Sequence, residues 1–178
     1  MNPEWHPELD RLAELRQAFD RSFAEAPTYQ VTALQDLLDI RLGATPYALR
    51  VAEIAGLFAD VKITPVPTRV AELLGIAAFR GSILPVYDLR ALIEHRVDTS
   101  PRWVAVSAGN SIGLAFDRFE GHMRVGEDAM VPQGGRESTV RHVREVVRID
   151  GLVRPVLSIR SVVEAVTSRV RSGAREKE

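Results

Sequence analysis

Hydrophobic residues recur at every second position along much of the chain, in short stretches separated by turn residues. "LLDIRL" places Leu38, Ile40 and Leu42 on one face, and "YALRV" repeats this alternation after the turn "GATP". "WVAVSA" and "SIGLAF" flank Gly109-Asn110, which is typical of a tight hairpin, and "HVREVVRI" predicts another strand. A period of two with frequent turns predicts a mainly β protein with a closed architecture.

Helical periodicity is clearest near the N-terminus. In residues 8–25, Leu9, Leu12, Phe19 and Phe23 recur at three- and four-residue steps, which predicts an amphipathic helix. This helix either lies on the body of the protein or docks a partner. "TPVPTRVAELLG" favours one helical turn, and "VGEDAMVPQGGREST" is typical of a long loop. After residue 168 the charged, small residues predict a frayed tail.

One phrase occurs twice, seventy residues apart. "RGSILPVYDLRALIE" occupies residues 80–94 and "DGLVRPVLSIRSVVE" occupies residues 150–164. A glycine at each tip supplies the positive φ of a tight turn, and the proline of the outgoing strand must lie at an edge or a bulge. Asp88 and Ser158 follow as helix N-caps. Each copy therefore predicts a hairpin, a cap and a short helix.

A single hairpin unit cannot bury both faces, so two related units are expected to pack as two small barrels around one core. Repeated residues then serve the fold, and function is expected where the copies differ. At the hairpin tip one copy has Arg80 and the other has Asp150. Because a hairpin tip is exposed, packing does not need the charge of Arg80, which makes this arginine the first candidate for function.

Composition narrows the classes of function. The 178 residues include 23 basic and 24 acidic side chains, a net charge of −1, and no cysteine. This balance does not favour nucleic-acid binding, which needs a surplus of Lys and Arg. Apolar runs are too short for a membrane span, and the N-terminus lacks the pattern of a secretion signal. We therefore expect a cytoplasmic protein that is not inserted in a membrane and binds no nucleic acid.

Candidate catalytic and metal groups are few. The four histidines show no metal-ligand spacing, so no metal and no cofactor are expected. Ser82, Asp88 and His95 form a triad on paper, without the G-x-S-x-G elbow of hydrolases. "GGR" at 134–136 follows no strand–helix pattern that would cradle a phosphate. The acidic group of Asp117, Glu120, Glu127 and Asp128 is a solvated loop or a weak cation site. We expect no enzyme.

Several segments, in order, resemble the CheW family. "AAFRGSILPVYDLRALI" is similar to its signature, in which N-L-R-G precedes a strand ending in P-V-x-D-L-R. "YALRVAEI", "ITPVPTRVAELLGI", "SIGLAFDRFEGHMRV" and "VRIDGLVRPVLSIRSVV" resemble further family segments, so the likeness covers about residues 36–166. Ala78 and Phe79 replace the signature asparagine and leucine, and Ser158 replaces a common aspartate.

The resemblance implies two five-stranded SH3-like β-barrels that share a hydrophobic core, with an added N-terminal helix and a short C-terminal helix. The expected organisation is a helical extension at 1–30, the double barrel at 31–168 and a charged flexible tail at 169–178. It also implies a non-catalytic adaptor that couples the helical tip of methyl-accepting chemoreceptors to the regulatory domain of a CheA-type histidine kinase, in arrays at the inner membrane. Implied partner-binding residues are Val51, Glu53, Ile54, Arg80, Gly81, Leu114, Phe116 and Asp117. The alternatives are a divergent module that serves a non-chemotaxis partner and, last, a small hydrolase.

Overall fold

The chain divides into two units, Met1–Thr32 and Ala33–Glu178. The structure is a computed structural model that describes residues 33–94, 100–109, 111–133, 140–149 and 151–175. All strands and helices within these ranges belong to the second unit. The helix expected at residues 8–25, the "GGR" segment at 134–136, and His95 and Asp150 lie outside the described residues.

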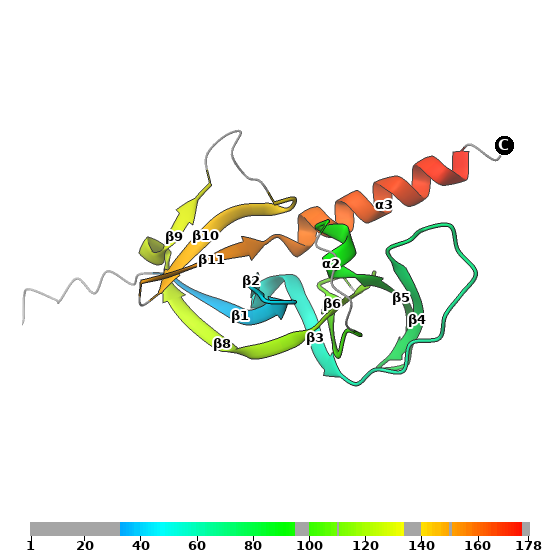
Figure 1. The fold of residues 1–178 in the computed structure, drawn as a ribbon, viewed down its shortest axis with the longest axis horizontal. Helices are drawn as coiled ribbons and strands as arrows, with labels where there is room; N and C mark the ends of the chain where they lie inside the picture. Colours follow the sequence, from blue (N-terminus) through cyan, green and yellow to red (C-terminus); the bar gives the residue numbers. More distant parts are fainter. Residues whose placement is uncertain (1–32, 95–99, 110, 134–139, 150, 176–178) are drawn as a thin grey trace, which may run out of the picture. The chain divides into compact units, whose positions relative to one another are not determined.

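Two mixed β-sheets make up most of the second unit (Figure 1). The first sheet has the strand order β8 (Arg118–Gly126), β1 (Leu34–Leu42), β2 (Thr45–Arg50), β11 (Leu152–Leu157), β10 (Val143–Ile149) and β9 (Met130–Pro132). The second sheet has the order β3 (Ile54–Ala59), β6 (Trp103–Ser107), β7 (Gly113–Phe116), β5 (Ser82–Asp88) and β4 (Leu73–Phe79). The helical elements are η1 (Val51–Glu53), α2 (Leu89–Leu92), η2 (Glu127–Ala129) and α3 (Ile159–Arg175). The mainly β prediction is confirmed, and the first sheet has six strands rather than five because β9 joins it.

Each sheet contains one strand that directly follows a strand of the other sheet in the chain; we call this the exchange of β3 and β8. β3 follows β2 directly in the chain, yet it pairs with β6 of the second sheet. β8 follows β7 directly, yet it pairs with β1 of the first sheet. Each sheet is thus completed by an edge strand from the neighbouring hairpin of the other sheet. The crossing points are η1 on one side and Asp117, between β7 and β8, on the other.

The doubled phrase adopts the same geometry twice. In the β4–β5 hairpin Gly75 pairs with Val86, and in the β10–β11 hairpin the residues seventy positions later, Glu145 and Val156, pair in the same way. Both hairpins have a bulge at the same place, next to Gly75 in one and next to Glu145 in the other. The repeat predicted from the sequence is therefore a structural repeat.

Both predicted N-caps are present. The carboxylate of Asp88 accepts a 2.9 Å hydrogen bond from the backbone N–H of Arg90, at the start of α2. The hydroxyl of Ser158 accepts a 3.2 Å hydrogen bond from the backbone N–H of Ser161, in the first turn of α3. The two side chains differ chemically but satisfy the same need, because the first N–H groups of a helix lack partners within it.

The hydrophobic core has a shared part and a separate part for each sheet. The shared cluster includes Ile40 and Leu49 from the first sheet, Leu114 and Phe116 from the second, and Val162 from α3. A second cluster lies within the second sheet, and a third cluster lies within the first sheet. The expected core common to both halves is therefore confirmed.

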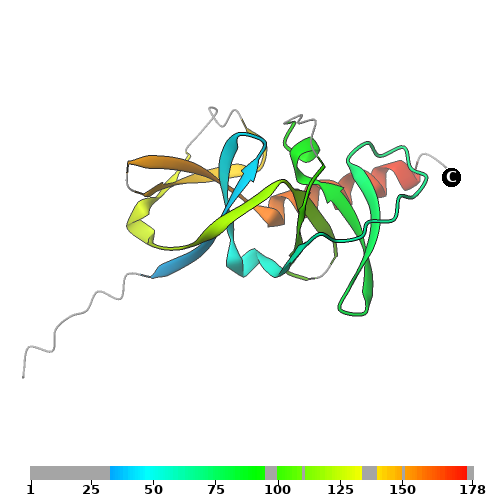
Figure 2. The ribbon, with the colours of Figure 1, turned by 60° about the horizontal axis from the view of Figure 1, so that its bottom comes forward.

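α3 connects the two halves (Figures 1 and 2). It leaves β11 of the first sheet, buries Val162 and Val166 in the shared core, and packs beside β6 of the second sheet. Arg169 bonds Glu72, before β4, at 2.9 Å. Since these contacts hold the helix beyond residue 168, it continues to Arg175 into the segment expected to be a frayed tail.

Two other expectations are wrong. Between β3 and β4 there is no helix but only a single turn, in which the N–H of Leu73 donates to the C=O of Val70 at 3.1 Å, and Thr64 makes an isolated bridge with Ile76 on the edge of β4. The long loop expected after Val125 contains η2 and the short strand β9, which pairs with β10. In both cases an extended segment adds to a sheet edge, a long-range pairing that local composition does not reveal.

Candidate functional site

Arg80 lies at the rim of a groove of about 230 Å³ on the second sheet. We call it the Arg80 groove, and its lining residues are Ala55, Gly56, Phe58, Phe79, Arg80, Ser82, Leu84 and Val106. The rings of Phe58 and Phe79 meet edge to face with 5.1 Å between centroids, and the Arg80 guanidinium carbon lies 5.8 Å from the centroid of the Phe58 ring. An exposed cation above an aromatic, concave surface is suited to contact with another protein.

The hairpin turn determines where Arg80 lies. Arg80 and Gly81 are the two turn residues between Phe79 and Ser82, with φ of 47° and 85°. Two successive positive φ values define the turn that best matches the twist of antiparallel strands, and glycine adopts this conformation without strain. Arginine has a conformational cost there. The turn therefore fixes the backbone from which the exposed Arg80 side chain projects at the hairpin tip.

Glu53 is a structural support for α3. Its Oε2 accepts hydrogen bonds from the backbone N–H groups of Ile159, at 2.5 Å, and Arg160, at 3.2 Å. A carboxylate at a helix N-terminus satisfies free donors and opposes the positive end of the helix dipole. Beside it, Ile54 packs against the shared core and Val51 is half-buried in η1. This crossing segment therefore holds the second sheet and α3 together.

A smaller cleft of about 170 Å³ lies next to this crossing. We call it the α3 cleft, and it is lined by Ala52, Glu53, Ser107, Ala108, Ile159, Arg160, Val163 and Glu164. Its walls come from η1, from the β6–β7 hairpin and from the first turns of α3. It is therefore a concave surface formed jointly by both halves of the fold.

Leu114 and Phe116 do not lie at the surface. Both side chains have 0% exposure and belong to the shared core. Their predicted direct contact with a partner is therefore corrected: in β7, between β6 and β5, all four residues are buried, and these two face the interior between the sheets. They support the fold behind the clefts.

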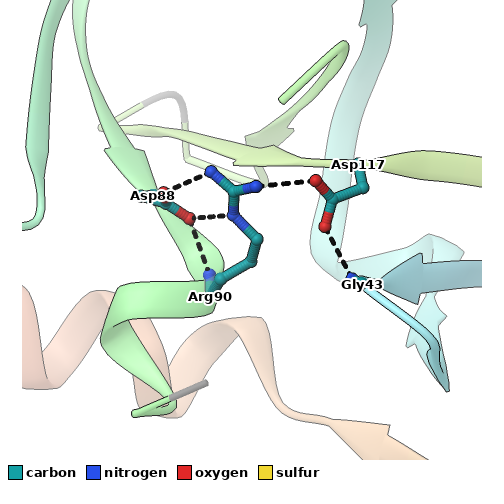
Figure 3. Close-up of polar contacts among 4 residues, drawn as sticks. All are labelled: Gly43, Asp88, Arg90 and Asp117. Atoms are coloured by element: carbon teal, nitrogen blue, oxygen red, sulfur yellow. Dashed lines mark hydrogen bonds and ion pairs between the residues drawn. The ribbon is translucent and has the colours of Figure 1, made fainter. Parts of the chain in front are cut away.

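Asp117 is a partner of a buried arginine (Figure 3). The Arg90 side chain is 5% exposed and forms ion pairs with Asp88 at 2.7 Å and with Asp117 at 2.6 Å. The second oxygen of Asp117 accepts a 2.7 Å hydrogen bond from the backbone N–H of Gly43, in the β1–β2 turn. Hydrogen bonding to Asp88 raises the pKa of Arg90 further above its usual value. The predicted binding role of Asp117 is therefore replaced by a link between the two sheets.

Sequence reasoning missed Arg90 and Phe58 as organising residues. The repeat pairs Arg90 with Arg160, but Arg90 is buried whereas Arg160 is exposed, so the repeat carried no signal for an ion pair. Phe58 lies half-buried on β3 and lines the Arg80 groove. The sequence "IAGLFA" could have indicated that Phe58 lies on a strand. It could not indicate that this strand joins the second sheet, which is what brings Phe58 beside Arg80.

The triad of Ser82, Asp88 and His95 is not assembled. Ser82 and Asp88 are the first and last residues of β5, so about 20 Å of strand separates them. The Asp88 carboxylate is bonded to Arg90, and His95 lies outside the described residues. Among the proposed acidic cation ligands, Asp117 pairs with Arg90 and Glu120 with Arg41. No cluster of three or more possible metal ligands occurs in the described part of the chain.

The fold and these surfaces define an interaction module: paired sheets around a common core, with clefts bounded by apolar and charged side chains. The sequence model of the CheW-like domain family matches residues 36–167. The chain therefore belongs to the CheW-like family, as its sequence motifs predicted. The chain is therefore a CheW-like adaptor, a class of protein that acts through protein–protein interaction.

Two known proteins illustrate the relationship. Protein FrzA of Myxococcus xanthus is 28% identical over 142 residues, which is 77% of this chain and 86% of FrzA. The crystal structure of the scaffolding protein TtCheW from Thermoanaerobacter tengcongensis aligns with a TM-score of 0.64 at 20% identity, over 70% of this chain and 89% of TtCheW. The second comparison shows the fold. Within the described residues, no helix is long and apolar enough to cross a membrane.

Proposed function

We propose that this chain is a non-catalytic adaptor that couples the helical tip of a chemoreceptor to the regulatory domain of a CheA-type histidine kinase. Membership of the CheW-like family supports this role. The observation that carries the proposal is the Arg80 groove, where an exposed cation lies against the aromatic rings of Phe58 and Phe79. Such an adaptor works in the cytoplasm and is recruited to receptor arrays at the inner membrane.

The kinase regulatory domain is assigned to the Arg80 groove. Arg80 is exposed and makes no ion pair with the described residues, so a carboxylate of the partner is its natural counterion. Gly81 contributes the turn, and the half-buried Val51 and Ile54 precede the part of β3 that lines the groove at Ala55, Gly56 and Phe58. A small interface of this kind predicts a modest affinity.

The receptor tip is assigned to the α3 cleft. An amphipathic helix buries one apolar face in a groove, and the cleft presents the half-buried Val163 between the charges of Arg160 and Glu164. Both halves of the fold contribute to this cleft. A receptor bound there would contact η1, which continues directly into β3 of the kinase surface.

Titration calorimetry with the regulatory domain of the kinase from the same genome tests the first contact. Arg80→Glu should weaken binding at least tenfold and leave the thermal midpoint within a few degrees. Arg148→Glu is the control, because Arg148 is also an exposed arginine, on β10 of the other sheet. Binding by neither wild type nor control would reject the coupling role and favour a divergent adaptor with a non-chemotaxis partner. Unfolding of Arg80→Glu would show that Arg80 is structural.

A further inference from the structure

The edge of the second sheet is open beside Ala78. Thr64 and Ile76 exchange two backbone hydrogen bonds of 2.8 and 2.9 Å, so the N–H and C=O of Ile76 point away from β5. In an antiparallel strand this direction recurs every second residue, and the register from Ile76 to Phe79 is regular. The N–H and C=O of Ala78 therefore also point outward, and no described residue bonds them.

The corresponding edge of the first sheet is covered more fully. There β9 pairs with β10 at three successive positions, with Val131 opposite Val146 and Met130 opposite Val147. Val146 lies seventy positions after Ile76, so Val131 occupies the place that Thr64 takes on the second sheet. Coverage of the second sheet stops at this one bridge. The corresponding edge of the first sheet accepts an extended segment with apolar side chains, and we expect the equivalent β4 edge to accept a segment of the same kind.

The open edge borders an apolar groove of about 500 Å³, which we call the β4 groove. It is lined by Phe58, Val61, Lys62, Thr64, Ile76, Ala77, Ala78, Phe79 and Ile83. Ile83, the cross-strand neighbour of Ala78, is 70% exposed. The apolar Ala78 stands where the family signature has an asparagine, so no polar side chain at this position interrupts the groove.

Charge restricts the occupant. Lys62 is an exposed cation at the rim of the β4 groove, and no ion pair of Lys62 is found among the described residues. On the other sheet the position equivalent to Ala78 is Arg148, so the two edges differ in polarity as well as in coverage. An occupant suited to the second sheet alone carries apolar residues that face Ala78 and Ile83, and a carboxylate that meets Lys62.

We propose that the β4 edge at Ala78 is a second docking site, which binds an extended, apolar peptide segment with an acidic residue by adding it to the sheet as a strand. Main-chain hydrogen bonds to Ala78 provide affinity, and the β4 groove and Lys62 provide selectivity. The two sites share Phe58 and Phe79 but differ in their key residues: Arg80 does not line the β4 groove, and Lys62 and Ala78 do not line the Arg80 groove.

The test uses the full chain, labelled with nitrogen-15, and a short acetylated peptide in which valine alternates with threonine and the last residue is glutamate. Amide chemical shifts should change mainly at Ala77, Ala78 and Phe79. The same peptide with methylated backbone nitrogens should bind at least tenfold more weakly, because it cannot complete a strand ladder. Equal binding of both peptides, or shift changes elsewhere, would overturn the proposal.

Variants separate this site from the others. Ala78→Pro removes only an outward N–H, which an edge strand tolerates, and should weaken the peptide at least tenfold. Arg148→Pro makes the same change on the other sheet and should not weaken it. Lys62→Glu should reverse the preference between peptides that end in glutamate and in lysine.

Arg80→Glu should leave the peptide affinity within twofold, so a failed kinase contact and a failed strand site are distinguishable. Concentration-dependent dimers that form through Ala78 without peptide would replace this proposal with self-association.

Discussion

The carboxylate of Glu53 accepts a 2.5 Å hydrogen bond from the backbone N–H of Ile159, 106 positions later in the chain. This contact joins η1, where the chain crosses between sheets, to the first residue of α3. The resemblance to the CheW family implied that Glu53 contacts a partner. The structure shows that the same side chain already holds a helix that spans both halves.

Replacement of Glu53 should therefore reduce stability. Glu53→Ala leaves the N–H groups of Ile159 and Arg160 without this acceptor, and the loss of such a cap costs about 1 to 2 kcal/mol in the free energy of unfolding. Urea denaturation measures the effect. Glu164→Ala is the control, because Glu164 is exposed on α3 away from its first residue, and it should change stability by less than about 0.5 kcal/mol. Equal effects would refute the capping role.

Arg90 should be among the least replaceable charged residues. Arg90→Ala leaves Asp88 and Asp117 without their shared cation in a site that is nearly inaccessible to water, and the loss of one partner from a buried pair costs about 3 to 5 kcal/mol. Arg102→Ala is the matched control. Arg102 pairs with Asp60, but its side chain is 64% exposed, so this change should cost less than about 1 kcal/mol. Thermal unfolding of both variants compares them directly.

The doubled phrase explains why much of this fold was predictable. Hairpin tips, caps and bulges are local features, and Gly81, Asp88 and their counterparts Gly151 and Ser158 indicate them residue by residue. The exchange of β3 and β8 was not predictable in this way, because it depends on which distant edge each strand meets. For this reason the candidate site was harder to predict from the sequence than the fold. Without the exchange, Phe58 cannot be placed beside Arg80, and Asp117 cannot be recognised as a bridge to Gly43.

Stability should also depend on His142 as the pH falls. Burial, and then the nearby Arg141, Arg169 and Arg144, lower the pKa of His142 below its usual value of 6.5. The unfolded chain therefore takes up this proton first, and the folded state loses stability as the pH falls below about 6.5. Ser161 faces the ring, with 2.9 Å between its hydroxyl and Nδ1.

His142→Gln retains a group that can bond to Ser161 and removes the titration. The variant should lose less stability than the wild type between pH 7 and pH 5, as measured by urea denaturation at each pH. At pH 8 both proteins carry a neutral side chain at this position, so the comparison there isolates the effect of packing. If the two pH profiles remain parallel, His142 does not contribute to the acid sensitivity.

Gly75 should tolerate no side chain. Its φ is 148°, and a Cβ atom at this position would lie 2.1 Å from the backbone oxygen of Thr64, where the chain crosses the β4 edge. Gly75→Ala must therefore push the Thr64 bridge away from Ile76, at a cost on the order of 3 kcal/mol.

Gly121→Ala provides the comparison, because Gly121 on β8 has open space around its Cβ position and no positive φ. It should change the midpoint of thermal unfolding by no more than about two degrees. Amide hydrogen exchange in Gly75→Ala should also rise first at Thr64 and Ile76, whose hydrogen bonds form the bridge. Protection at both amides equal to that of the wild type would mean that the segment between β3 and β4 is not held in place by its close approach to Gly75.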